Sequence, residues 1–346
     1  MDLRETMKVL CSECCPSGFE SRVAAKAQEL LAPLCDETWI DRSGNCIGVK
    51  RCGLENARKV LLVAHLDEIG LMSTGAEEGM LRFTTIGGVD PRMLPDRELT
   101  ILTDPPIFGV VAALPPHVLS EEDKSSALKV SDLRIDIGYP QEEAEKLVPP
   151  GTPISFRKNT YSLGENLYCG TSLDDRSCFA ACMLALELLQ NRKLDCDVYV
   201  MGSTIEETNS MGAITGGYAI DPDYCIVIDV AHADTPDGGP VNMPCKLGKG
   251  PLIATGPNIQ THISDHVIKL AKEKRIPYQF EPRGGNTHTD AWPMQIAREG
   301  FNMTLISLPM RYMHTPIEVI DIRDVKWIAE LLAECIANPC KEVYGC

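Results

Sequence analysis

Four short runs of apolar residues, separated by long stretches of mixed polarity, constrain the fold of this chain more than any other feature. Each run is too short for a helix and lacks the alternation of a strand that has one face in water. Runs of this kind are typical of strands buried on both faces, as in parallel sheets. The predicted strands are 59–66, 197–203, 224–230 and 303–309.

Amphipathic segments with helical periodicity lie between these strands. Alternation of buried strands with such helices indicates an α/β fold, with a mostly parallel, mixed sheet flanked by helices on both faces. The predicted helices cover 20–34, 174–192, 209–219, 259–274, 289–299 and 322–337.

The region 71–163 has a different pattern. It contains short alternating runs, such as those that begin at Met80 and Glu98, punctuated by Gly-Gly and Pro-Pro pairs, and only 141–147 has a helical pattern. This pattern predicts a small β-rich domain inserted into the α/β domain. A chain of 346 residues is long for a single core, and we expect a catalytic domain of two parts, 1–70 and 164–346, around an insertion at 71–163.

Charge and composition exclude several classes of partner. The formal net charge is −16, which argues against nucleic acid, because nucleic-acid binding requires clustered Lys and Arg. No apolar run approaches the roughly 20 residues that span a bilayer, and the first residues lack a signal pattern. We therefore expect no membrane association and a cytoplasmic location. The fifteen cysteines are then expected to be reduced thiols.

Acidic and histidine residues follow the predicted strands closely. In open α/β sheets, ligands bind beyond the carboxyl ends of the strands, so these side chains can converge on one edge of the sheet. The residues are His65 and Asp67 after the first strand, Glu206 and Glu207 after the second, Asp229 at the end of the third, His314 after the fourth, and Asp174 and Asp175 at the start of a long helix.

Two histidines and several carboxylates can hold a pair of metal ions. Imidazole suits zinc or cobalt, carboxylates can bridge two ions, and paired ions can activate a water between them. Each piece also has a simpler interpretation. A lone histidine at a strand end is commonly just hydrogen bonded, Asp174-Asp175 can cap a helix, and Glu206-Glu207 can be an exposed loop. Asp229 is harder to explain in that way, because an unpaired carboxylate is costly at the end of a buried strand.

Six stretches, taken in order, closely resemble one known family over nearly the whole chain. The family is that of the tetrahedral (TET) aminopeptidases, dinuclear metallopeptidases that include glutamyl and deblocking aminopeptidases. The resemblance is specific because it depends on all six stretches together and not on any single motif. The stretches are AHLDEIG, GTSLDDRS, EETNSMGA, VIDVAHADTP, KLGKGP and LPMRYMHTP.

The resemblance implies a role for each residue. His65 and Asp229 are expected to bind one metal ion, and Glu207 and His314 the other. Asp174 is expected to bridge the two ions, with a cis peptide to Asp175. Asp67 is expected to orient His65, and Glu206 to act as the general base.

The implied activity is hydrolysis of N-terminal residues from short peptides by a metal-bridged hydroxide. Two divalent ions per subunit are expected, with zinc favoured and cobalt or manganese left open. The resemblance also implies assembly of dimers into a hollow homododecamer.

Three other functions are weighed against this one. A related di-zinc deacylase or carboxypeptidase uses similar ligands, but it carries its extra domain between the last two ligands, where residues 230–313 suffice only for the core sheet. A glycosidase has no need of two histidines, and only three tryptophans are available to stack on sugars. A non-catalytic scaffold would be expected to lose ligands, yet all five are present.

The sequence departs from the family pattern near the proposed site. Ile205 and Asn209 replace a usual Gln and Gly around the Glu pair. His288 is an added neighbour of Asp290 and an alternative to His314 as a ligand. The match of RYMHTP to the family pattern favours His314. His232 is expected at most beside the substrate. The remaining histidines, His117, His262 and His266, are expected at the surface.

Overall fold

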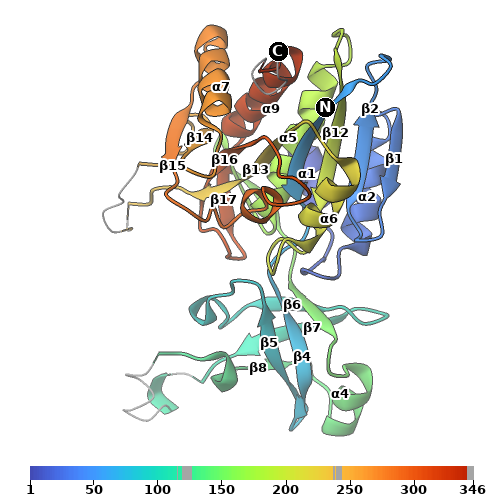
Figure 1. The fold of residues 1–346 in the computed structure, drawn as a ribbon. Helices are drawn as coiled ribbons and strands as arrows, with labels where there is room; N and C mark the ends of the chain where they lie inside the picture. The colour runs from blue at the N-terminus through green and yellow to red at the C-terminus, as the bar shows by residue number, and fades with distance from the viewer. Residues whose placement is uncertain (115, 119–126, 237, 239–243, 341–346) are drawn as a thin grey trace.

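Eleven strands form one large mixed sheet in the part of the chain that the structure describes (Figure 1). The structure is a computed structural model, and it describes residues 1–114, 116–118, 127–236, 238 and 244–340. The strand order is β1-β2-β12-β3-β13-β16-β17-β11-β10, with β14 paired to β16 and β15 paired to β14. The predicted fold class, a mostly parallel mixed sheet flanked by helices, is confirmed.

The four predicted strands are the centre of this sheet and run parallel to one another. All eight residues of the second are buried, and so are the last six of the first. The parallel register places His65 opposite Ser203, so that these neighbouring strands end at the same edge of the sheet. In chain order the strands are β3 (Arg58–His65), β12 (Cys196–Ser203), β13 (Tyr224–His232) and β16 (Met303–Arg311).

Shorter strands, which the sequence analysis did not predict, extend the sheet on both sides. Most pair antiparallel with their neighbours, and only β14 and β15 pair in parallel. They are β1 (Glu37–Ile40) and β2 (Cys46–Lys50) at one side, and β17 (Glu318–Asp321), β11 (Leu167–Gly170), β10 (Thr160–Leu163), β14 (Leu252–Thr255) and β15 (Gln279–Pro282) at the other.

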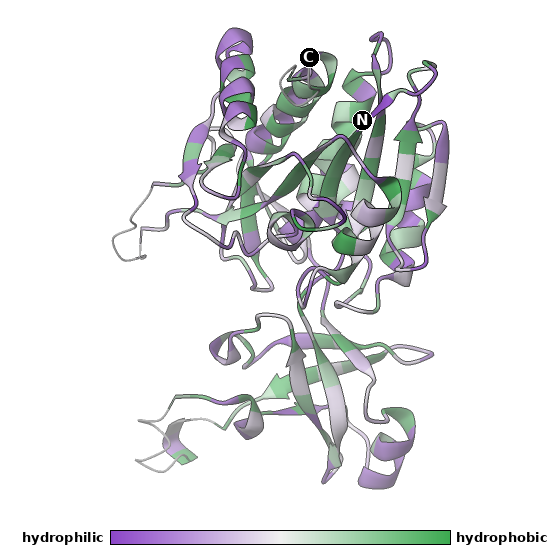
Figure 2. Ribbon diagram, in the orientation of Figure 1, coloured by the Kyte–Doolittle hydropathy of each residue, from purple (hydrophilic) through white to green (hydrophobic). Residues whose placement is uncertain are grey.

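Helices cover both faces of the sheet, and the hydrophobic residues concentrate between the layers (Figure 2). The two faces of the sheet have separate hydrophobic cores, and alternate residues of β3 pack in each. Leu62 packs in the larger core and Leu61 in the smaller one. The larger core is formed with α1 (Leu3–Cys11), α2 (Ser21–Leu31), α5 (Leu173–Leu188), α7 (Thr261–Lys274) and α9 (Ile322–Ala337), and the smaller core with α6 (Met211–Ile220) and α8 (Ala291–Met294).

One predicted helix is much shorter than expected. The pattern at 289–299 predicted a helix along its whole length, but α8 covers only four residues. Beyond it the chain continues in turns, and Arg298 has a φ of 55°, outside the helical region. A left-handed residue cannot continue a right-handed helix, so no helix could extend past Arg298 to the predicted end.

The region of the predicted insertion forms a closed six-stranded barrel (Figure 1). All neighbouring strands in it are antiparallel, and alternate residues such as Leu81 and Phe83 point to a core of their own. The strands are β4 (Gly70–Glu77), β5 (Met80–Ile86), β6 (Glu98–Ile101), β7 (Ile107–Ala112), β8 (Arg134–Asp136) and β9 (Pro153–Phe156).

Short helical segments complete the barrel region, and the next strand returns to the large sheet. The helix α4 (Gln141–Leu147) agrees with the predicted one, and 3-10 turns occur at Pro91–Met93, Pro116–Val118 and Val130–Asp132. Strand β10 pairs with β11 in the large sheet, although it falls inside the range assigned to the insertion. The domain boundaries at 70/71 and 163/164 stay predictions.

Candidate metal centre

The carboxyl ends of the central strands bring the predicted site residues together. His65 is the last residue of β3, Asp229 lies in the second half of β13, and Glu206 and Glu207 come three and four residues after β12. His314 comes three residues after β16, and Asp174 lies in the first turn of α5. The chain order of these residues is scattered, but the strand order β12-β3-β13-β16 makes them neighbours.

Asp174 lies between the two imidazoles. One of its carboxylate oxygens is 3.1 Å from His65 Nε2, and the other is 3.6 Å from His314 Nε2. Glu207 Oε2 lies 3.2 Å from the same Nε2 atom of His314. A carboxylate that offers one oxygen to each of two nitrogen ligands has the arrangement that a bridging ligand requires.

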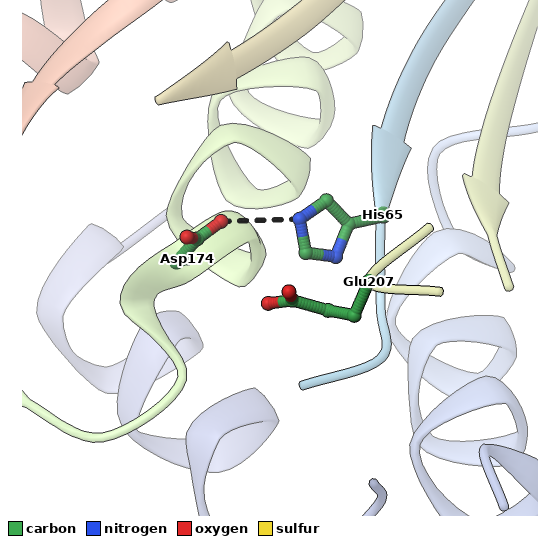
Figure 3. Close-up of side chains that lie close together, drawn as sticks. All are labelled: His65, Asp174 and Glu207. Atoms are coloured by element: carbon green, nitrogen blue, oxygen red, sulfur yellow. Dashed lines mark hydrogen bonds and ion pairs between the residues drawn. The ribbon is translucent and has the colours of Figure 1, made fainter. Parts of the chain in front are cut away.

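Two overlapping groups of side chains are compact enough to hold a cation each. In one, ligand atoms of His65, Asp174 and Glu207 lie within 4.8 Å of one another (Figure 3). In the other, His65 is joined in the same way by Asp175 and Asp229. The sequence analysis gave Asp175 no ligand role, and its peptide bond to Asp174 is cis, as the resemblance implied.

Asp67 contacts more of the site than the sequence indicated. Its two carboxylate oxygens accept the backbone N–H groups of Glu206 and Glu207, each at 3.1 Å. His65 Nδ1 lies 3.2 Å from the backbone carbonyl oxygen of Asp67 and 3.6 Å from its carboxylate. Asp67 is completely buried, and this one residue contacts the imidazole through its backbone carbonyl and the loop of the two glutamates through its carboxylate.

Negative charge is in excess at this edge of the sheet. Both carboxylate oxygens of Asp175 are buried without a hydrogen-bond partner among the described residues. Burial raises the pKa of Asp175, Glu206 and Asp229 well above their ordinary values, and repulsion between the carboxylates adds to the effect. The site opens into a cavity of about 460 Å³, and no Lys or Arg is found among its described lining residues.

Divalent cations fit this donor set. Buried carboxylates without positive partners are costly, and a cation among them supplies the missing charge and favours their ionised forms. Imidazole nitrogens with carboxylate oxygens are the ligands of catalytic zinc and related ions. The chain therefore contains a candidate site for divalent metal ions.

Glu206 stands at the edge of the cluster rather than within either group. Its Oε2 atom lies 3.9 Å from His65 Nε2, and its side chain is 13% exposed towards the cavity. A carboxylate in this place is free of the metal-binding groups but adjacent to them, which is the geometry that a general base needs.

Two further buried carboxylates support the site. Glu318, in β17, accepts the backbone N–H of Asp174 at 3.1 Å, and Asp290 accepts the Ser203 hydroxyl at 2.6 Å. The sequence analysis mentioned Asp290 only as a neighbour of His288 and missed Glu318. Its signal was an acid within the apolar stretch Ile317–Ile320, where an unpaired charge would be costly.

His314 touches Glu207 but belongs to neither group, and the histidines outside the predicted site belong to neither as well. His232 and His288 line the cavity but belong to neither metal-sized cluster. His117 is exposed, as expected. His262 and His266 are partly exposed in the wall of a second cavity, near the amino ends of β3 and β12.

The cysteines are all free thiols in the described part of the chain. Cys11 and Cys15 are buried in the core, and burial raises their pKa values to about 12 and about 11. A thiol with such a pKa stays protonated and is a poor metal ligand. The reduced state expected from the sequence is therefore the state of these residues in the structure.

Comparison with known proteins identifies the family. The model of the M42 glutamyl aminopeptidase family matches residues 44–331. Lysyl aminopeptidase of Pyrococcus furiosus is 36% identical over 327 residues, which is 93% of each chain. An aminopeptidase from the archaeon Desulfurococcus kamchatkensis is 33% identical, with a TM-score of 0.90 over 99% of this chain and 96% of its own.

A third similar structure connects the fold to a known assembly. The Pyrococcus horikoshii TET1 peptidase, described as able to assemble into a tetrahedron or a large octahedral shell, is 29% identical. Its TM-score is 0.84, over 97% of this chain and 99% of its own. Fold and site together thus define a peptide hydrolase. The chain belongs to the M42 glutamyl aminopeptidase family, and the resemblance to the TET aminopeptidases noted in its motifs is confirmed.

Within the described ranges, no helix is both long enough and apolar enough to cross a bilayer. The cytoplasmic location inferred from the sequence stays a prediction.

Proposed function

We propose that this protein removes N-terminal residues from short peptides, using two divalent cations and Glu206 as the general base. The observation that carries the proposal is the position of Asp174, with one oxygen towards His65 and the other towards His314. Asp229 would complete the ligands of the ion at His65, and Glu207 those of the ion at His314. Zinc suits these donors best, and cobalt and manganese can use them too.

The chemistry divides between the ions and the chain. When bound, two cations of this kind polarise a peptide carbonyl and lower the pKa of a water molecule. Glu206 accepts the proton of the attacking water and returns it to the departing amine. A carboxyl whose pKa is raised by burial suits both steps, because it holds a proton long enough to deliver it. The Asp67 carboxylate keeps Glu206 in place by accepting a hydrogen bond from the backbone N–H of Glu206.

The excess of carboxylates would also favour the binding of peptide N-termini. The free α-amine of a peptide carries positive charge near neutral pH, and the acidic cavity attracts it. An N-acetylated peptide has no such charge. The barrel lies between Asp67 and Asp174 in the sequence, as expected for an aminopeptidase rather than for the related deacylases and carboxypeptidases.

A peptide digest tests this proposal. A ten-residue peptide with a free amine should shorten by one residue at a time from its N-terminus, as followed by mass spectrometry, and its acetylated form should stay intact. Shortening from the C-terminus would support the carboxypeptidase instead, and release of the acetyl group would support the deacylase.

We also propose that the chain assembles from dimers into a homododecamer. The support is its similarity to the TET1 peptidase, whose tetrahedral form is the assembly that the resemblance implied. Light scattering should give a mass of about twelve times the 37.9 kDa of one chain. A mass of 37.9 kDa would contradict the proposal.

A further inference from the structure

Two segments connect the barrel to the α/β body, and each carries one half of a buried ion pair. The first segment runs from the end of β3 to the start of β4 and contains Glu68; the second runs from the end of β9 to the start of β10 and contains Lys158. The two side chains are 5% and 11% exposed, and Lys158 Nζ donates a hydrogen bond to Glu68 Oε2. The chemistry proposed above does not use this pair.

The pair extends to the segment that carries Asp174. Ser172 Oγ donates to Glu68 Oε2 and accepts a hydrogen bond from Lys158 Nζ at 2.7 Å. Ser172 is the residue before α5 and has a φ of 62°, so its backbone conformation sets how the chain enters the turn of Asp174. These contacts form a closed triangle of Glu68, Lys158 and Ser172, named here the linker clamp.

The other contacts of Glu68 fix the clamp within the body. Its Oε1 atom accepts the backbone N–H of Cys15 at 2.8 Å and the Ser155 hydroxyl at 3.0 Å. Arg176, which is fully buried in α5, lies 3.8 Å from Oε2. That guanidinium donates instead to backbone carbonyls of the N-terminal region and of Leu66. Lys158 is therefore the cation hydrogen bonded to Glu68.

Charge balance shows how firmly the clamp is held. Burial by itself raises the pKa of the Glu68 carboxyl, but Lys158 and Arg176 outweigh burial and lower the pKa to about 2. Without Lys158, the buried Glu68 carboxylate would lose its hydrogen-bonded cation and would no longer be held in one position. The Ser172 hydroxyl would lose the hydrogen bond from Lys158, and its own acceptor, Glu68, would be free to move. The effect would then reach the turn that carries Asp174.

We propose that Lys158 is a positioning residue, which ties the barrel's return segment to the turn of Asp174 and thereby sets the geometry of the metal-binding carboxylates. The inference rests on the proposed role of Asp174 as a metal ligand. It gives the barrel a part in forming the site, because Lys158 reaches Glu68 and Ser172 only when the return segment is docked on the body.

Zinc affinity is the measurement that tests the clamp. Lys158→Met keeps the aliphatic chain and removes the charge, and we expect its zinc affinity, measured by competition with a chromophoric chelator, to fall tenfold or more. kcat should fall with the affinity, while KM changes little. Lys158→Arg, which restores a cation of similar reach, should recover most of both. Lys146→Met, an exposed change on α4, serves as the matched control and should alter neither.

A second variant covers the case in which Lys158→Met does not fold. Ser172→Ala removes only the hydroxyl that joins the clamp to the Asp174 segment, and its zinc affinity should fall at least threefold while its thermal unfolding temperature changes by a few degrees at most. A purely structural role would lower the unfolding temperature of these variants and leave zinc affinity and kcat unchanged, which would overturn the inference. If the unaltered protein binds none of zinc, cobalt and manganese, the proposed function fails first, and the two failures are thus distinguishable.

Discussion

Glu206→Gln should abolish nearly all turnover without disturbing the metal site. Glutamine has the shape of glutamate but cannot accept a proton at neutral pH, so loss of the general base should lower kcat by about 10²–10⁴-fold. Glu206 belongs to neither cluster of metal-sized spacing, and its backbone N–H would still bond to Asp67. Metal content and the unfolding temperature should therefore stay close to those of the unaltered protein.

The comparison needs a carboxylate outside the site. Glu330→Gln makes the same chemical change at an exposed position of α9 and should leave kcat unchanged. Steady-state kinetics on an aminoacyl anilide, together with elemental analysis of the same samples, give both quantities. If Glu206→Gln keeps more than a tenth of the activity, Glu206 is not the base. If it loses metal, its role is that of a ligand.

His65→Ala should remove metal as well as activity. The imidazole is 2% exposed, and its loss removes a proposed ligand of one ion together with the contact to Asp174, the proposed bridge to the other. The remaining carboxylates, Asp174, Asp175 and Asp229, would then face one another with even less compensating charge. We expect at least one equivalent of metal per chain to be lost and hydrolysis to fall below detection.

Elemental analysis after dialysis measures this loss directly. His117→Ala is the matched control, because His117 is exposed and lies outside the site. Equal metal content in the two variants would count against His65 as a ligand. Circular dichroism shows whether the fold survives, and a folded His65→Ala protein without metal is the expected result.

The central strands and the positions of the site residues could be read from the sequence, for a physical reason. Strands β3, β12, β13 and β16 are buried on both faces, so their apolar runs stand out, and the polar residues that end them are conspicuous. Strands of four residues, such as β14, β15 and β17, carry too little pattern to be recognised. Glu318 was missed together with β17 for this reason.

The supporting contacts of the site could not be predicted, because they depend on backbone groups and on chain segments distant in sequence. Asp67 binds two N–H groups that every residue possesses, and nothing in the sequence distinguishes these two. Glu68 stood beside the site residues without an assigned role until the structure placed Lys158, 90 positions further along, against it. Only the tertiary structure shows that two such distant residues form a pair, because a sequence motif identifies single residues and not their partners.

Metal-dependent hydrolysis of aminoacyl anilides is the most direct test of the central claim, that the buried carboxylates and imidazoles form an aminopeptidase centre. The protein is stripped with a chelator and assayed on free and N-acetylated anilides, before and after zinc or cobalt is added back. We expect no release from the stripped protein, and release from the free substrates alone once metal returns. Release that does not depend on metal, or equal release from acetylated substrates, would contradict the account.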